Sequence, residues 1–301
     1  MKYVLEILPE NLKEELKLID INKVTEIRLR VNERCQLRFG KEEKFCNYIA
    51  NKNTIIDILK RITNSSIYAV QDEINNGFIT IRGGHRIGVV GEVVYSDGKI
   101  KNVKNIQSMN IRIAREVIGA SDNIMQYIVG NNEYYNTLIM SPPGCGKTTM
   151  LRDMVKNLSN GGYNVGLIDE RGEIASTYNG IKTLDVGNRT DILSYCNKAQ
   201  GIAMLIRSMS PDIIATDEIG SKEDIEAIYK ATKSGVKLLF TIHGNNIEDI
   251  SNNEDYNELI RYGNFKNLII LDKSKEPGYI KEIYTNLDNL VSKKQEEVIW
   301  K

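Results

Sequence analysis

The chain has 301 residues, of which 41% are hydrophobic and 27% charged, and its 40 basic residues balance 40 acidic ones. This composition is typical of a globular protein with room for two domains, and the zero net charge gives no general attraction to nucleic acid or to an anionic membrane. No apolar run approaches the roughly 20 residues that span a bilayer. We therefore expect a cytoplasmic protein without a transmembrane segment.

The first part of the chain mixes helical and strand patterns. Leucines at spacings of three and four predict an amphipathic helix within residues 1–20. Alternating apolar and charged residues predict a strand over 24–31. Further elements are expected as a helix over 54–70, two or three strands over 78–100 with a hairpin at Ser96-Asp97-Gly98, and a strand over 109–116. Residues 1–118 are thus predicted to form a compact α+β domain.

The pattern changes after a linker, which we place at 119–136 within a predicted helix and polar loop. From Thr137 onward short apolar strands alternate with helices, and the expected strands are TLIM, VGLID, DIIATDE, KLLFTIH and NLIIL. Strands without polar alternation are typical of a parallel sheet covered by helices on both faces. We therefore predict an α/β domain at 137–301, whose charged end, VSKKQEEVIWK, forms a short helix or a frayed tail.

A phosphate-binding loop is predicted at residues 141–149, SPPGCGKTT, between the strand TLIM and a helix. Glycines let consecutive backbone N–H groups point at phosphate oxygens, and the start of the following helix adds its positive dipole end. In such loops the lysine reaches the β- and γ-phosphates and the next hydroxyl binds Mg²⁺. We expect Ser141 to replace the usual first glycine without loss, and ATP to bind through Pro143, Gly144, Cys145, Gly146, Lys147, Thr148 and Thr149.

Two acidic residues follow a predicted strand about seventy residues later, in SPDIIATDEIG. The carboxyl ends of parallel strands meet at one edge of the sheet, which brings these carboxylates beside the phosphate loop. Asp217 is predicted to hold the magnesium ion through its bound water, together with Thr148. Glu218 is predicted to orient or deprotonate the attacking water.

Further polar residues end two other predicted strands at the same edge. Asp169, Glu170, Arg171 and Glu173 lie together at the end of VGLID, and we expect Glu170 or Glu173 to help position water or magnesium. His243 ends KLLFTIH close to Thr241, where such a pair can sense the γ-phosphate. In each case ordinary surface or structural polarity is the alternative.

These motifs together resemble the stage III sporulation protein AA family of endospore-forming bacteria, which is related to the hexameric ATPases of type II and type IV secretion. The resemblance covers nearly the whole chain and rests on EIRLRVN, TIRGGHRIGVVGEV, NIRIARE, SPPGCGKTTMLRD, IDERGEIA, SPDIIATDEIG and FTIHG. It implies a RecA-like C-terminal domain behind a smaller N-terminal domain.

The resemblance also implies how the chain works. Subunits would form rings of six, with ATP between neighbours and an arginine of the N-terminal domain completing the site; the candidates are Arg86, Arg112 and Arg115. The ATPase would dock on membrane-embedded subunits of a channel between mother cell and forespore, and would power or assemble it.

Other functions remain open at this point. A structural subunit could bind ATP with little turnover, although the Asp217-Glu218 pair argues for hydrolysis. A nucleic-acid motor needs a basic, aromatic groove, whereas residues 119–301 carry 20 basic against 25 acidic side chains. A small-molecule kinase would need an arginine-bearing lid, which we do not find after the phosphate loop.

Overall fold

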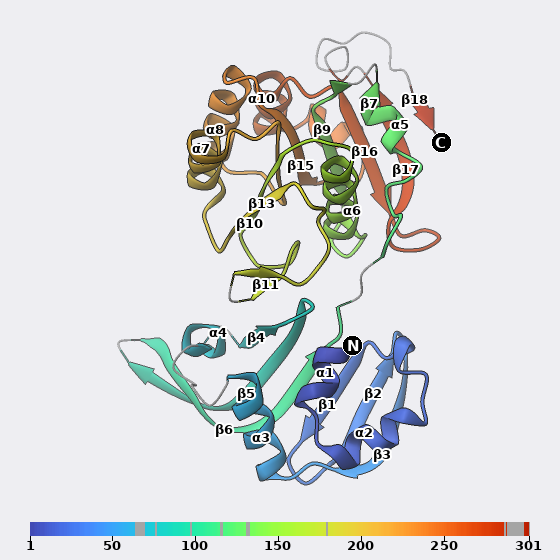
Figure 1. The fold of residues 1–301 in the computed structure, drawn as a ribbon, viewed down its shortest axis with the longest axis vertical. Helices are drawn as coiled ribbons and strands as arrows, with labels where there is room; N and C mark the ends of the chain where they lie inside the picture. The colour runs from blue at the N-terminus through green and yellow to red at the C-terminus, as the bar shows by residue number, and fades with distance from the viewer. Residues whose placement is uncertain are drawn as a thin grey trace. The chain divides into compact units, whose positions relative to one another are not determined.

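The computed structural model describes residues 1–63, 70–75, 77–96, 98–114, 117–130, 133–178, 180–285, 287 and 298–300. Internal packing divides the chain into two compact units (Figure 1). Unit 1 consists of Met1–Arg115 with Ser176–Thr183, and unit 2 of Glu116–Ala175 with Leu184–Lys301.

Unit 1 is built on an antiparallel sheet with the strand order β3-β2-β1-β6-β5-β4. Its strands are β1 (Glu26–Arg30), β2 (Arg34–Phe39), β3 (Glu42–Ile49), β4 (Phe78–Ile81), β5 (His85–Ser96) and β6 (Lys99–Arg112). β1 alternates as predicted, with Ile27 and Leu29 buried. The sequence analysis predicted neither β2, in which Cys35 and Leu37 are buried, nor β3, in which Cys46 is the one buried residue and no apolar face marks the strand.

The hairpin predicted at Ser96-Asp97-Gly98 joins β5 to β6, where Ser96 pairs with Lys99; Asp97 lies outside the described residues. A further small hairpin of unit 1 consists of β11 (Thr177–Tyr178) and β12 (Ile181–Lys182).

The helices of unit 1 pack their apolar residues on the sheet to form one core. They are α1 (Lys2–Ile7), α2 (Glu10–Lys17), the 3₁₀ turn η1 (Ile21–Lys23), α3 (Lys52–Ile62) and α4 (Gln71–Asn75). The single helix expected within residues 1–20 is interrupted at Leu8, which is extended (φ −77°, ψ 153°). The reason is Pro9, which disfavours a helical residue before it and caps α2. The helix predicted over 54–70 is α3, and residues 64–69 lie outside the described part.

His85 is a buried histidine of unit 1, with 2% of its surface exposed. Its Nδ1 accepts a hydrogen bond of 3.0 Å from the backbone N–H of Ala114, so that nitrogen carries no proton. Burial, and next the charge of the nearby Met1 amino group, lowers the pKa of His85 to about 4.

We expect the stability of the protein to fall as the pH drops from 6.5 to 4. In this window the unfolded chain binds a proton at His85 that the folded protein does not, which corresponds to about 3 kcal/mol. Urea unfolding at a series of pH values measures the loss, and a His85→Gln variant should lose correspondingly less. Equal losses for the parent and the variant would contradict this assignment.

Unit 2 is built on a sheet with the strand order β13-β10-β14-β15-β9-β16-β17-β18. Its strands are β9 (Thr137–Ser141), β10 (Val165–Asp169), β13 (Thr190–Ser194), β14 (Ile213–Thr216), β15 (Lys237–His243), β16 (Asn267–Asp272), β17 (Tyr279–Thr285) and β18 (Val298–Trp300). Neighbours from β13 to β16 are parallel, and β17 and β18 add an antiparallel edge. All five apolar strands predicted from the sequence lie in this sheet.

Helices cover both faces of this sheet, as predicted (Figure 1). They are α5 (Met125–Ile128), α6 (Lys147–Asn160), α7 (Lys198–Met209), α8 (Lys222–Lys233), α9 (Ile247–Ser251) and α10 (Glu254–Gly263). Alternate residues of β9 enter two separate cores: Leu138 and Met140 pack with α7, α8 and α10, whereas Ile139 packs with α5 and α6. Both faces are apolar for this reason, and the α/β fold class is confirmed.

Two segments of unit 2 differ from the sequence prediction. Between 117 and 136 the expected helix is reduced to turns and α5, followed by the hairpin of β7 (Val129–Gly130) and β8 (Glu133–Tyr134). Tyr134 is buried there, and its hydroxyl donates to the carbonyl oxygen of Leu238 at 3.0 Å. At the end of the chain, β18 pairs with β17 where we expected a helix or a frayed tail; residues 288–297 and 301 lie outside the described part.

Candidate active site

The predicted phosphate loop lies between β9 and α6, at the carboxyl edge of the parallel strands. Gly144 (φ +75°) and Gly146 (φ +87°) adopt left-handed backbone conformations that favour glycine. Gly146 is the N-cap of α6, and no side chain caps the N–H groups of the first turn. The first four N–H groups of a helix have no partner inside it, so this end of α6 offers donors to an anion.

The backbone of a distant loop lies against the phosphate loop. Gly278, in the connection between β16 and β17, donates its N–H to the carbonyl oxygen of Cys145 at 2.9 Å. A Cβ atom on Gly146 would lie 3.1 Å from the Gly278 nitrogen. Both the backbone conformation and the close approach of Gly278 therefore favour glycine at position 146. No local pattern in the sequence indicated the contact between Gly278 and the phosphate loop.

Lys147, the first residue of α6, is buried with its ammonium group among polar atoms. The Nζ atom donates to the carbonyl oxygen of Ser141 at 2.7 Å and lies 3.0 Å from Nδ1 of His243. Burial lowers the pKa of Lys147, while the charges of Glu218, Cys145 and Asp217 act in the opposite direction. An anion bound beside it would therefore stabilise the charged form. Thr148 and Thr149 follow on the first turn of α6, half-buried.

Glu218, the second residue after β14, has a left-handed conformation (φ +45°), which is uncommon for a residue other than glycine. Its backbone N–H donates to the hydroxyl of Thr241 at 2.9 Å. Its carboxylate lies between a histidine and an arginine. Oε1 is 3.3 Å from Nε2 of His243, and Oε2 is 3.0 Å from the guanidinium of Arg171. Such local strain is found most often at functional sites.

Asp217 is the buried partner in the acidic pair that follows β14. Burial raises the pKa of this carboxyl group, and the nearby charges of Asp169 and Glu218 act in the same direction. The charges of Lys198 and Arg171 oppose the increase. A divalent cation would favour the ionised form further.

The acidic residues at the end of β10 and in the loop after it have different contacts. Asp169 accepts hydrogen bonds from the backbone N–H groups of Glu173, Ile174 and Ala175, at 2.8, 3.1 and 2.9 Å, so this carboxylate shapes the loop. The backbone of Glu173 is also held, because its carbonyl oxygen accepts a hydrogen bond from Arg152 at 2.6 Å.

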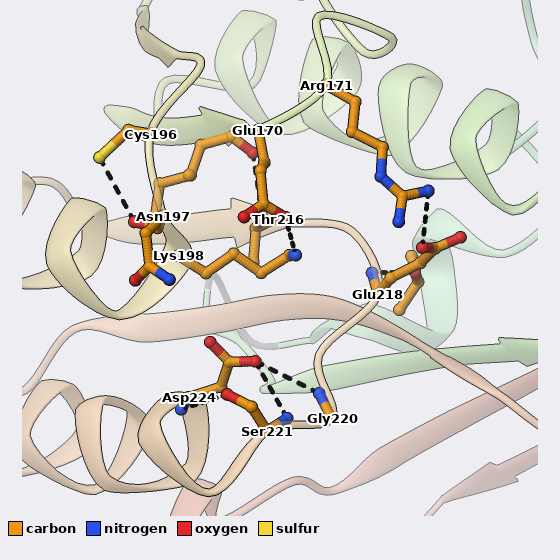
Figure 2. Close-up of polar contacts among 12 residues, drawn as sticks. Glu170, Arg171, Cys196, Asn197, Lys198, Thr216, Glu218, Gly220, Ser221 and Asp224 are labelled. Carbon is orange, nitrogen blue, oxygen red and sulfur yellow. Dashed lines mark hydrogen bonds and ion pairs between the residues drawn. The ribbon is translucent and has the colours of Figure 1, made fainter. Parts of the chain in front are cut away.

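Glu170 forms an ion pair with Lys198, and Figure 2 shows the two side chains meeting. Lys198 is a buried residue that the sequence analysis missed. It opens α7 directly after the N-cap Asn197, where a cation opposes the helix dipole. That unfavourable position is a signal that could have indicated a role for this lysine.

The three candidate arginines belong to unit 1. Arg86 and Arg112 are directly opposite each other on β5 and β6, and the guanidinium of Arg86 stacks over the ring of Phe78 at 4.8 Å. Arg112 is also directly opposite Glu26 on β1, so an acidic residue adjoins the two arginines. Arg115 lies outside the described residues.

The residues present fit a Mg²⁺-nucleotide better than a protein-only metal centre. Within the described ranges, no group of three or more His, Cys, Asp or Glu side chains is arranged to hold a metal ion. Magnesium is commonly held by one or two carboxylates together with substrate phosphates, and Asp217 stands beside donors suited to phosphate. In the same part of the chain, no helix has the length and apolarity that crossing a membrane requires.

Comparisons with known proteins identify the family of the chain and proteins that share its fold. The family model "Sporulation stage III, protein AA" matches residues 2–291. Stage III sporulation protein AA of Bacillus subtilis is 36% identical over 301 residues, covering 97% of this chain and 98% of that protein. The structure of the Legionella pneumophila ATPase DotB matches with a TM-score of 0.57 at 15% identity, and that of the pilus retraction motor PilT with bound ADP matches with 0.59 at 16%. Each match covers 87% of this chain and 76% of the other, and at these identities it shows a shared fold.

Proposed function

The chain belongs to the sporulation stage III protein AA family, and from that premise we propose that it is a Mg²⁺-ATP-hydrolysing subunit that drives or assembles a secretion-like channel in sporulation. One observation carries the proposal. The side chains of Lys147, His243 and Glu218 form a continuous line of contacts from the phosphate loop, past the end of β15, to a carboxylate that follows β14. Binding of phosphate and activation of water are thereby joined in one site.

In the proposed reaction, the backbone N–H groups of residues 144–149 hold the phosphates of ATP, Pro143 shapes the loop before them, and Lys147 donates to the β- and γ-phosphoryl oxygens. Thr148 and Asp217 would hold the magnesium ion, Asp217 through a bound water. The ion supplies charge neutralisation at the phosphoryl oxygens. Glu218 orients the attacking water and accepts its proton.

The remaining polar residues have supporting roles in this proposal. His243 contacts both Lys147 and Glu218, so it is placed to sense whether a γ-phosphate lies between them. Glu170 is neutralised by Lys198 and would position water or magnesium through that pair. Glu173 is the weaker candidate for the same role, because its backbone is fixed by Asp169 and Arg152.

We further propose that the active form is a ring of six. Arg86, Arg112 or Arg115 of one subunit would complete the site of its neighbour, and membrane-embedded channel subunits would dock on the ring. This part rests on the resemblance to secretion ATPases.

The proposal is tested by measuring phosphate release from Mg²⁺-ATP without an added acceptor, over a range of protein concentrations, alongside the mass of the assembly. We expect hydrolysis to rise with the fraction of hexamer. ATP binding without turnover in the assembled ring would favour a nucleotide-gated structural subunit. Turnover that requires DNA, with an affinity that falls steeply as salt increases, would favour a nucleic-acid motor.

A further inference from the structure

Arg171 contacts the centre of the proposed site, although the mechanism above assigns it no role. Its guanidinium lies 3.0 Å from Oε2 of Glu218, and both residues belong to unit 2, the unit that carries the phosphate loop. Figure 2 shows Arg171 reaching Glu218 from the loop after β10. An arginine is therefore present at the water-activating carboxylate without any contribution from a second subunit.

The loop that carries Arg171 is held in one conformation. The carboxylate of Asp169 accepts the backbone N–H groups that follow Arg171 and Gly172, beginning with that of Glu173 at 2.8 Å. Gly172 has a left-handed conformation (φ +67°), and a Cβ atom there would lie 2.9 Å from the hydroxyl of Tyr195. Arg171 is thus presented from a fixed turn, as a preorganised catalytic group requires.

The contacts of Arg171 place it beside the proposed catalytic residues. From the phosphate loop, the line of contacts runs from Lys147 through His243 to Glu218 and ends at Arg171. A γ-phosphoryl group held by Lys147, with its attacking water on Glu218, would lie along this line.

An ion pair alone does not explain the position of Arg171. Its side chain is 57% exposed, and the carboxylate that it contacts is 30% exposed. Pairs between solvent-exposed charges contribute little to stability. A planar guanidinium, in contrast, is suited to phosphoryl oxygens, because it donates two parallel hydrogen bonds.

We propose that Arg171 is a catalytic arginine acting in cis, within the same subunit that binds the ATP. As the water oxygen bonds to the γ-phosphorus, the bond from that phosphorus to the β,γ-bridging oxygen breaks and ADP leaves. Arg171 donates N–H groups to the γ-phosphoryl oxygens during this step, while Glu218 takes the proton of the water. This assignment rests on the proposed ATPase function.

The first test compares Arg171→Ala and Arg171→Lys with the parent. Arg171→Ala should lower kcat by about 10³-fold, the lower end of the effect of a catalytic arginine, and should leave KM within a few-fold. Arg171→Lys should recover only part of kcat, because an ammonium lacks the planar fork. Independently of turnover, Arg171→Ala should bind fluorescent ATP normally and lose affinity for ADP with aluminium fluoride. Arg207→Ala, at an exposed arginine of α7, is the matched control.

A mixing experiment separates cis from trans action. A Lys147→Ala subunit lacks its own ATP site but carries an intact Arg171, so adding it to Arg171→Ala restores hydrolysis only if the arginine acts between subunits. We expect no restoration. The assignment is overturned if mixing restores activity, or if Arg171→Ala hydrolyses ATP at the parent rate or faster, as an inhibitory contact would predict. Lack of hydrolysis by the assembled parent would overturn the proposed function and this assignment together.

Discussion

Replacement of Lys147 with alanine is expected to weaken nucleotide binding strongly and to abolish turnover. The ammonium group already donates to the Ser141 carbonyl oxygen and contacts His243, so it is aimed at the mouth of the phosphate loop. Two hydrogen bonds from a cation to phosphate are each worth about 1.5–3 kcal/mol, so their loss should weaken ATP binding by about 10²–10⁴-fold. Titration with a fluorescent ATP analogue measures this, and ATP should no longer raise the melting temperature of the variant.

The same variant is not expected to unfold. Burial lowers the pKa of Lys147, which shows that its charge is unfavourable where it lies in the absence of an anion. We therefore expect the melting temperature without nucleotide to be unchanged or slightly raised. Lys230→Ala is the control, because Lys230 is an exposed lysine of α8 that pairs with Glu226. Binding of ATP by Lys147→Ala with parental affinity would show that the phosphate loop has been misassigned.

The sequence predicted those parts of unit 2 whose patterns are local. The strand, glycine loop and helix around residues 137–160 have their signals side by side in the chain, and the apolar strands are marked by burial on both faces. Glu218 and His243 were also predicted, because parallel strands that end in polar residues must deliver them to one edge of the sheet.

The parts that sequence could not predict depend on contacts between distant residues. Gly278 packs on the phosphate loop from a connection more than one hundred residues away, and Lys198 and Arg171 find their carboxylate partners only when the strands are in register. In unit 1, β3 was missed because a largely exposed edge strand needs no apolar face. Sequence patterns report burial and local conformation, whereas ion pairs at a site are set by the fold.

Replacement of Glu218 with glutamine is expected to trap bound ATP. The amide keeps the size of the carboxylate and can still contact His243 and Arg171, but it cannot accept the proton of the attacking water. General base catalysis contributes about 10²–10⁴-fold, so kcat should fall by that factor while ATP affinity stays near the parental value. Single-turnover hydrolysis with radiolabelled ATP, followed by analysis of the retained nucleotide, distinguishes trapped ATP from ADP.

The choice of glutamine separates a chemical role of Glu218 from a structural one. Glu218 has φ +45°, and its N–H is bonded to Thr241, so a larger change at this position would disturb the turn after β14 as well as the chemistry. Glu223→Gln, in the exposed first turn of α8, makes the same chemical change away from the site and should hydrolyse ATP normally. If Glu218→Gln hydrolysed ATP at the parental rate, the water would have to be activated elsewhere. Glu170 would then be the next carboxylate to replace, because its pairing with Lys198 leaves it at the same edge of the sheet.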